Sequence, residues 1–285
     1  MTAPSSPTPT APMGADLGII RDIRQASQTS HTDFGLLMAQ AAQESGFRPD
    51  AKAATGSAAG LFQFVQSTWL DMMHRFGAKY GHPDLAKAIT FNAAGKPVVG
   101  DPAMRQRILA LRSDPALSAA LAGEYANLNK DEVERALGHT VGRADLYMAH
   151  FLGPGGAATF LKALETNGST PAAALLPEAA ASNRAVFYDS DTGRARSVAE
   201  IYRSLGGRIE QEAQDFAADP ALAAASPGAN GTDPAMAAAA IPRPVNFAGL
   251  TLSQPVAAML GTLTLAALKL VGGAPAQPHK PDSHA

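Results

Sequence analysis

Helix signals recur along this chain between residues 16 and 213, and the alternation typical of strands is almost absent there. Apolar residues recur at helical spacing, which is the pattern of amphipathic helices. Asp101 and Asp114 each precede a proline, which places an N-cap before a proline at the first helical position and predicts a helix start. Gly138 and Gly153 follow helical patterns as terminators. The sequence therefore predicts a mainly α domain.

The individual helices can be placed from these signals. We expect helices over residues 16–29, 33–44, 143–152 and 157–165, and further helices that start near Ser67, Pro102, Pro115, Lys130 and, behind a capping box of Ser197 and Glu200, Val198. A small irregular or hairpin segment is expected at residues 60–65.

Glu44 closes the second of these helices, for which Thr32 or Asp33 is a plausible N-cap. At about 100° per residue, Glu44 lies two turns from Leu37 and within roughly 20° of it around the axis, at the edge of the apolar face. Burial and the negative pole of the helix dipole both disfavour a carboxylate there. They favour the protonated carboxyl group that a glycosidic general acid needs. The alternative is a surface Glu in the last turn of a helix.

Several short motifs accompany Glu44 in a fixed order. Residues 42–46 (AQESG) end the helix, residues 57–64 (SAAGLFQF) follow, and residues 67–69 (STW) open the next helix. Residues 147–155 (YMAHFLGPG) end a later helix. This order resembles the soluble lytic transglycosylases, lysozyme-like enzymes that cleave the glycan strands of peptidoglycan, over roughly residues 16–166.

The resemblance implies a lysozyme-like helical domain with Glu44 as the catalytic residue. It also implies that Ser57, Phe62 and Gln63 line a sugar cleft opposite Glu44. A Gln side chain donates and accepts hydrogen bonds at once, which suits the acetamido and hydroxyl groups of amino sugars. The alternative for Gln63 is a buried amide in a glycine-containing turn that is satisfied by the backbone.

The segment before Gly153 departs from the commoner pattern of the family. His150 stands where many relatives have Tyr, and Phe151 stands where they have Asn. Tyr147 lies one turn before His150 on nearly the same helix face. Either side chain could bind substrate and orient Glu44; we favour Tyr147, because a phenol donates to a carboxylate without carrying charge. His150 as a neutral core residue is the alternative.

The implied reaction is the non-hydrolytic cleavage of the β-1,4 bond between N-acetylmuramic acid and N-acetylglucosamine, which leaves a 1,6-anhydromuramyl end. Most glycosidases use two carboxylates. The nearest candidates for a second one, Asp50 and Asp71, belong to no motif. One acid suffices if the C6 hydroxyl of the substrate attacks, with Glu44 as general acid and then base. A hydrolytic muramidase and a non-catalytic glycan-binding assembly module are the alternatives.

Composition argues against several other functions. The formal net charge of −2 and the pI of about 6.4 do not suggest a nucleic-acid surface. The chain has no cysteine, which excludes disulfides and cysteine-based metal sites. Its seven histidines lack metal-binding spacing, and no phosphate-binding loop is present. We therefore expect neither a cofactor nor a metal.

The expected substrate predicts a place in the periplasm or cell envelope, with peptidoglycan glycan strands as the partner. Residues 1–12 nevertheless have neither a basic nor an apolar region, so they are not a recognisable signal peptide. Export by a flagellar or other specialised secretion apparatus, or release by lysis, would explain this.

The chain divides by composition into five expected segments. They are a disordered leader (1–15), the lysozyme-like transglycosylase domain (16–213), an Ala/Pro/Gly linker (214–246), an apolar segment (247–272) and a disordered tail (273–285). The apolar segment is long enough to suggest membrane contact, but proline and polar residues dilute it. We favour its docking on a partner, such as a secretion or flagellar component, or on the catalytic domain.

Overall fold

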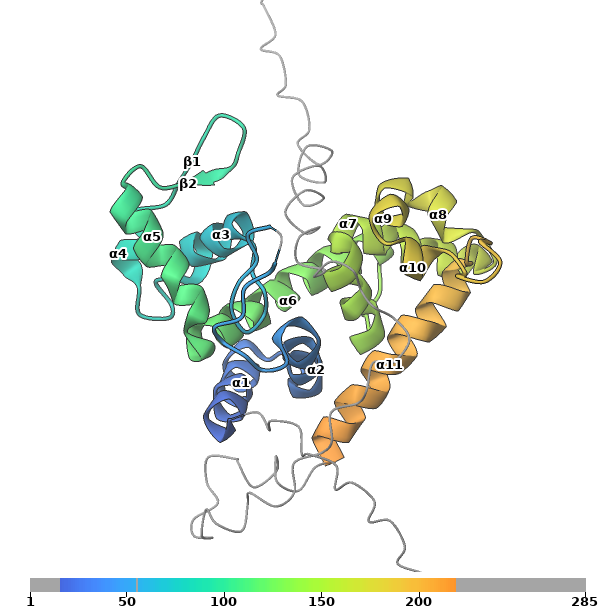
Figure 1. Cartoon of the computed structure of the whole chain (residues 1–285), viewed down its shortest axis with the longest axis horizontal. Coiled ribbons are helices and arrows are strands. Elements are labelled where there is room, and N and C mark those ends of the chain that lie inside the picture. Colours follow the sequence, from blue (N-terminus) through green and yellow to red (C-terminus); the bar gives the residue numbers. More distant parts are fainter. Residues whose placement is uncertain (1–15, 55, 219–285) are drawn as a thin grey trace, which may run out of the picture.

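The computed structural model describes residues 16–54 and 56–218 of the chain. The expected leader, the apolar segment, the tail and all but the first residues of the expected linker lie outside this part. Helices α1 to α5 lie at one end of the described part, α7 to α10 lie at the other, and α6 runs between them (Figure 1). α11 returns from the second end towards α2, and the prediction of a mainly α domain is confirmed (Figure 1).

The elements follow one another in this order: α1 (Leu17–Ser30), α2 (Phe34–Ser45), α3 (Gln66–Phe76), α4 (Pro83–Lys87), β1 (Thr90–Phe91), β2 (Pro97–Val98), α5 (Pro102–Ala110), the 3-10 helix η1 (Leu111–Ser113), α6 (Pro115–Leu137), α7 (Arg143–Asn167), α8 (Ala172–Leu175), α9 (Pro177–Ser182), α10 (Arg184–Phe187) and α11 (Val198–Ala218).

Aspartate N-caps start four of these helices, including the three for which the sequence predicts an aspartate cap. Asp16, Asp33, Asp101 and Asp114 each accept a hydrogen bond from a backbone N–H of the first turn. A carboxylate at this position satisfies an otherwise unpaired donor and faces the positive pole of the helix. These starts could be predicted because the signal is local.

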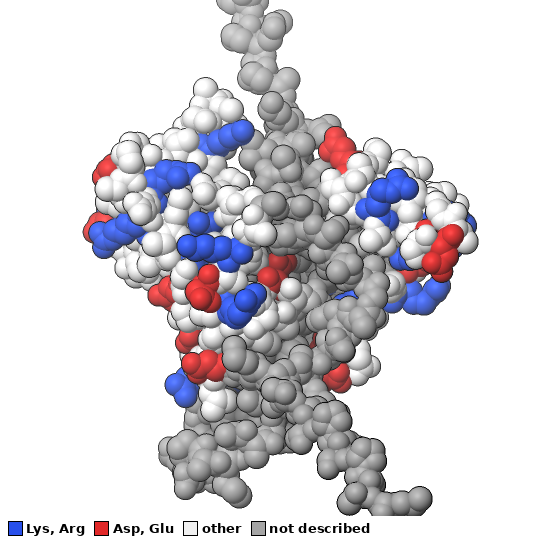
Figure 2. Space-filling view, in the orientation of Figure 1, with Lys and Arg blue, Asp and Glu red and all other residues white. Residues whose placement is uncertain are grey.

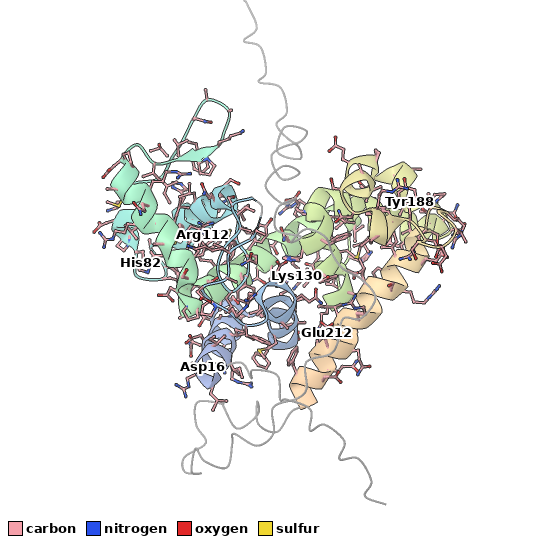
Figure 3. All side chains as sticks on the ribbon, viewed as in Figure 1. Asp16, His82, Arg112, Lys130, Tyr188 and Glu212 are labelled. Atoms are coloured by element: carbon pink, nitrogen blue, oxygen red, sulfur yellow. The ribbon has the colours of Figure 1, made fainter. Side chains whose placement is uncertain are left out.

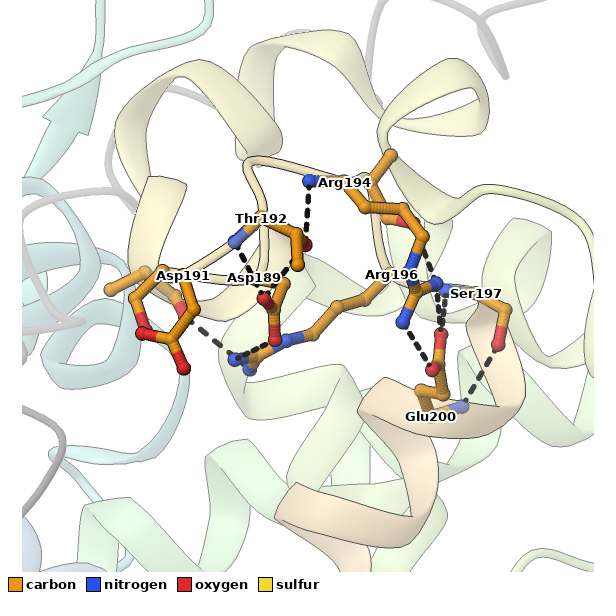
Figure 4. Close-up of polar contacts among 10 residues, drawn as sticks. Asp189, Asp191, Thr192, Arg194, Arg196, Ser197 and Glu200 are labelled. Atoms are coloured by element: carbon orange, nitrogen blue, oxygen red, sulfur yellow. Dashed lines mark hydrogen bonds and ion pairs between the residues drawn. The ribbon is translucent and has the colours of Figure 1, made fainter.

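The predicted capping box at the start of α11 is also present (Figure 4). The Ser197 N–H donates to Glu200 Oε2 at 2.7 Å, and the Glu200 N–H donates to Ser197 Oγ at 3.2 Å. Arg194 donates to the same carboxylate, and Asp189 lies 3.9 Å from Arg196 in the preceding turn (Figure 4). The hydrogen bond and charge of Arg194, together with the hydrogen bonds from Ser197, lower the pKa of Glu200 to about 2.

The prediction that a separate short helix starts at Lys130 is wrong, because α6 is one helix of 23 residues that passes through this position. Neither Lys130 nor the aspartate after it breaks a helix. α6 ends at Gly138, whose φ of 83° lies in the left-handed region, so this terminator is confirmed. The unbroken helix joins the two halves of the core, with Leu121 in one and Val133 in the other.

α7 is interrupted at Gly153, as expected. Gly153 has φ 71° and ψ 159°, outside the helical region and costly for a residue with a side chain. The helix resumes directly at Pro154, earlier than the expected residue 157. The interruption separates the segment that carries Tyr147 and His150 from the following helical segment.

Most of the described core lies in two large clusters of buried side chains, and α2 contributes to both; Ala58 and Val65 form a small third cluster. Leu37 and Met38 pack into the first cluster, whereas Leu36 and Ala39 pack into the second. Trp69 of α3 is fully buried in the first cluster. α2 is therefore held from both sides, which fixes the position of its last turn.

The segment between α2 and α3 is irregular, as predicted for residues 60–65. Ala59 forms isolated bridges with Lys52 and Phe64. Gly60 has a φ of 86°, and a Cβ atom there would lie 2.0 Å from the backbone oxygen of Arg112. Glycine is therefore required both by conformation and by the close approach of another chain segment.

The sequence missed several short elements. The strands β1 and β2 pair antiparallel, with Thr90 opposite Val98, and α4, α8, α9 and α10 each have six residues or fewer. Elements this short do not show a full period of apolar residues, so the pattern cannot reveal them.

α11 continues to Ala218, past the boundary expected at residue 213. Phe216 packs edge-on against Phe47, with ring centroids 6.1 Å apart. Among the helices of the described part, none is both long and apolar enough to cross a membrane. On the visible described surface, basic and acidic side chains are interspersed (Figure 2).

Candidate active site

Glu44 lies in the last turn of α2, and its side chain is only 6% exposed. The helix ends at Gly46, which has a φ of 59° and donates its N–H to the carbonyls of Ala41 and Ala42. The expectation that Glu44 lies at the edge of the buried face is therefore confirmed. A carboxyl group in this place is largely shielded from water.

His150 of α7 contacts the Glu44 carboxyl group directly. His150 Nε2 lies 2.9 Å from Glu44 Oε1, and the imidazole is 15% exposed. Tyr147 does not make this contact, because its hydroxyl group donates instead to Gln43 Oε1 at 2.7 Å. Our preference for Tyr147 as the hydrogen-bond partner of Glu44 is therefore wrong. Tyr147 and His150 lie one turn apart on α7, so they contact adjacent residues of α2.

Gln43 links the site to α11. Its Nε2 group donates to Glu212 Oε2 at 2.9 Å, while its Oε1 atom accepts from Tyr147. Figure 3 labels Glu212 on α11, near α2. Burial raises the pKa of Glu212, and the hydrogen bond from Gln43 opposes this shift. Burial and, to a smaller extent, the charge of Glu44 raise the pKa of Tyr147, so its phenol stays a donor.

Ser45 connects the end of α2 to the segment that follows it. Its Oγ atom donates to the carbonyls of Leu61 at 2.8 Å and Ala41 at 3.2 Å, and it accepts the N–H of Arg48 at 3.1 Å. The side chain is buried. These contacts fasten the end of α2 to the segment that contains Phe62 and Gln63.

A groove opens beside Glu44, and three of the expected sugar-binding residues line it. These are Phe62, Gln63 and His150. Tyr147 and Ser57 are not part of the lining. Tyr147 instead contacts Gln43, the residue that precedes Glu44 on α2.

Gln63 has most of its hydrogen-bonding capacity occupied by the backbone. Its Nε2 group donates to the carbonyls of Ala51 at 3.1 Å and Gly60 at 2.9 Å, and its φ of 46° is left-handed. Both amide hydrogens are thereby used, as in the alternative of a buried amide satisfied by a turn. Only the Oε1 atom is left to contact a ligand.

Ser57 supports the irregular segment. Its carbonyl oxygen accepts from Arg112 Nη1, which also donates to the carbonyl of Phe64 at 3.0 Å. Its Oγ atom accepts the N–H of Gln66 at 3.4 Å. Arg112, labelled in Figure 3, thus holds both ends of the segment that carries Phe62 and Gln63.

Sequence reasoning missed four polar residues that line the groove. They are Gln40, Thr68, Tyr125 and Asn129. A signal for Gln40 was present, because residues four apart share a helix face and Glu44 follows it by four. No comparable signal marks Tyr125 and Asn129, whose helix α6 meets the groove only after the chain has folded.

The groove lining contains no aspartate or glutamate among the described residues. Asp71 pairs with Arg75 on the surface of α3 at 2.9 Å, and Asp50 is exposed. Within residues 16–54 and 56–218, no three His, Asp or Glu side chains gather as metal ligands would. Glu44 has a carboxyl group that contacts a residue of the groove lining, namely His150.

A family model matches part of the chain. The model described as "Transglycosylase SLT domain" matches residues 21–90. The match includes Glu44, Phe62 and Gln63, and it ends before α6 and α7, which supply Asn129 and His150. Residues 21–90 of this chain are thus similar to the transglycosylase SLT domain, a domain of the lysozyme-like superfamily.

Proposed function

We propose that this protein is a peptidoglycan lytic transglycosylase in which Glu44 is the single catalytic carboxyl group. The contact between His150 Nε2 and Glu44 Oε1, at 2.9 Å, is the observation that carries the proposal. It holds a largely buried carboxyl group against His150, which lines the groove, and Glu44 lies within the part that matches a transglycosylase SLT domain. Among the described residues, Glu44 Oε2 has no hydrogen-bond partner, so this oxygen is free to meet a substrate.

In the proposed reaction, Glu44 first acts as a general acid. It transfers its proton to the glycosidic oxygen between N-acetylmuramic acid and N-acetylglucosamine as the C1–O bond breaks. The resulting carboxylate then takes the proton of the C6 hydroxyl group, whose oxygen attacks C1. The product is a 1,6-anhydromuramyl end, and Glu44 is protonated again.

A second carboxylate is not required in this scheme. The lining of the groove is largely apolar and has no acidic residue among the described ones, so the positive charge that develops at C1 needs another partner. The acetamido group of the substrate can supply it. This also favours the transglycosylase over a hydrolytic muramidase, which commonly uses a second carboxylate to activate water.

His150 serves as a positioning residue in this proposal. Its bond to Oε1 fixes the rotamer of Glu44, and it leaves Oε2 directed to substrate. The hydrogen bond from Tyr147 to Gln43 holds the residue before Glu44 on α2 against α7. Orientation by a fixed hydrogen bond contributes to catalysis because the carboxyl group does not have to reorganise during the reaction.

Digestion of purified cell walls tests the function. We expect the full-length protein to release muropeptides, and mass spectrometry should find anhydro ends. Reducing ends would indicate a hydrolytic muramidase. A wild-type protein that binds the cell walls but releases no muropeptides would indicate a non-catalytic glycan-binding module.

We further propose that the protein works in the periplasm or cell envelope, because peptidoglycan is found there. Its expected apolar segment, residues 247–272, is proposed to dock on a secretion or flagellar component; this segment lies outside the described residues. Fractionation of cells and affinity capture with and without residues 247–272 would test both statements.

A further inference from the structure

We infer that Gln40 and Asn129 form a pair of side-chain amides that binds the acetamido group of an amino sugar in the groove. Each residue is only 5% exposed, and each lines the groove beside His150. Within the described part of the chain, neither side-chain amide has a hydrogen-bond partner. Within the described residues, neither amide has a fully buried polar atom without a partner, so both amides are accessible from the groove. Donors and acceptors that are accessible and unpaired in a groove can bind a ligand.

Another Gln on α2 and another Asn on α6 do have hydrogen-bond partners for their side-chain amides. Gln43 of α2 donates to Glu212 and accepts from Tyr147. Asn127 of α6 donates to the carbonyl of Ser30 and accepts from Thr32. Both of these amides face protein and are satisfied, whereas Gln40 and Asn129 face the groove.

The chemistry of the groove fits an acetamido group. A side-chain amide offers N–H donors and a carbonyl acceptor, and a secondary amide presents the complementary carbonyl and N–H. Phe62, Val65 and Leu146 supply apolar surface around the pair, which suits a methyl group. No lysine or arginine lies in the described lining, so a phosphate or carboxylate ligand would lack a cationic partner.

The positions of the two amides relate this site to the proposed catalytic group. Gln40 lies one turn before Glu44 on α2, which places the two side chains on the same face. Asn129 follows Tyr125 by one turn on α6, and both line the groove. An acetamido group held here would fix the sugar next to Glu44. The inference thus rests on the proposed function and names the residues that select an N-acetylated substrate.

A binding experiment with matched sugars tests the inference. The probes are tri-N-acetylchitotriose and cellotriose, an uncharged β-1,4 trisaccharide that has hydroxyl groups in place of acetamido groups. The protein is the full chain with Glu44→Gln, and binding is measured by calorimetry. We expect a clear preference for the acetylated probe, and each of Gln40→Met and Asn129→Leu should reduce the affinity for this probe by about 3- to 10-fold. Affinity for cellotriose should change by less than about 2-fold.

Asn127→Leu is the matched control, because Asn127 faces protein. It should lower the melting temperature and leave the preference of the folded protein unchanged, whereas Gln40→Met and Asn129→Leu should not lower the melting temperature. Equal affinity for the two probes, no binding of the acetylated probe, or an unchanged preference in both groove variants would overturn the inference.

The outcome can be separated from that of the proposed function. If Gln40→Met and Asn129→Leu lose the preference but the wild-type protein cleaves no cell wall, the amide pair stands and the transglycosylase is rejected. Cleavage with anhydro products and an unchanged preference would reject the amide pair alone.

Discussion

His150 Nε2 lies 2.9 Å from Glu44 Oε1, and this contact joins two helices that are 106 residues apart in the chain. Glu44 lies within the part matched by the transglycosylase SLT domain, whereas His150 lies outside it. The candidate site therefore depends on the docking of α7 against α2. Gln43 and Tyr147 strengthen the same junction one residue away.

Replacing Glu44 by Gln should abolish turnover and keep the fold. The amide has nearly the same shape as the carboxyl group but cannot transfer the proton, so we expect the rate of muropeptide release to fall about 10²- to 10⁴-fold. Circular dichroism should be unchanged. Activity within about tenfold of the wild type would remove Glu44 from the mechanism.

Replacing His150 by Phe should reduce kcat more than it changes KM, because Glu44 loses the contact that orients it. His150→Gln, which can still donate to Oε1, should recover part of the rate. Full activity of His150→Phe would show that the contact is only structural.

Replacing Tyr147 by Phe should have a smaller effect on the rate, because its hydroxyl group contacts Gln43 and not Glu44. The expected loss of stability is about 0.5–1.5 kcal/mol, the usual contribution of one hydrogen bond, and urea unfolding measures it. If Tyr147→Phe were inactive while His150→Phe was normal, the two roles would be reversed.

Gly60→Ala should destabilise the protein much more than Gly46→Ala. Both glycines have positive φ, but a Cβ atom at Gly60 would lie 2.0 Å from the Arg112 carbonyl oxygen, whereas at Gly46 nothing lies within 4 Å. We expect Gly46→Ala to cost about 1–2 kcal/mol and Gly60→Ala at least about 2 kcal/mol more. Equal unfolding free energies for the two variants would contradict this explanation.

Asp33→Asn should lower stability at neutral pH but not in acid. Burial raises the pKa of Asp33, but the hydrogen bonds from Arg143 and the Leu36 N–H outweigh it and hold the pKa below its ordinary value of 3.8. A lowered pKa means that the charge contributes stability above 3.8, and that this contribution disappears as the pH falls through the folded pKa. Asn also caps helices well, so the variant isolates the charge.

At pH 7 we expect Asp33→Asn to melt about 1–3 °C below the wild type, since the ion pair is partly exposed. The difference should vanish when thermal unfolding is followed at a pH well below 3.8. A difference that stays constant over this range would mean that the pair with Arg143 contributes nothing.

Much of the helical framework could be predicted from the sequence, because the signals are local. The aspartate caps and the capping box at Ser197 act within one turn, and the terminators at Gly138 and Gly153 act at single residues. The continuity of α6 through Lys130 could not be predicted in this way. It depends on the helix spanning both halves of the core, which no local pattern records.

The sequence by itself determined the helical character of the domain, the place of Glu44 at the end of α2 and the irregular, glycine-dependent segment after it. Backbone preferences and helix periodicity decide these features within a few residues. Only the tertiary structure decided that His150 rather than Tyr147 contacts Glu44, and that Gln40 and Asn129 face one groove. Those relationships depend on how α6 and α7 dock against α2, which follows from the packing of side chains far apart in the chain.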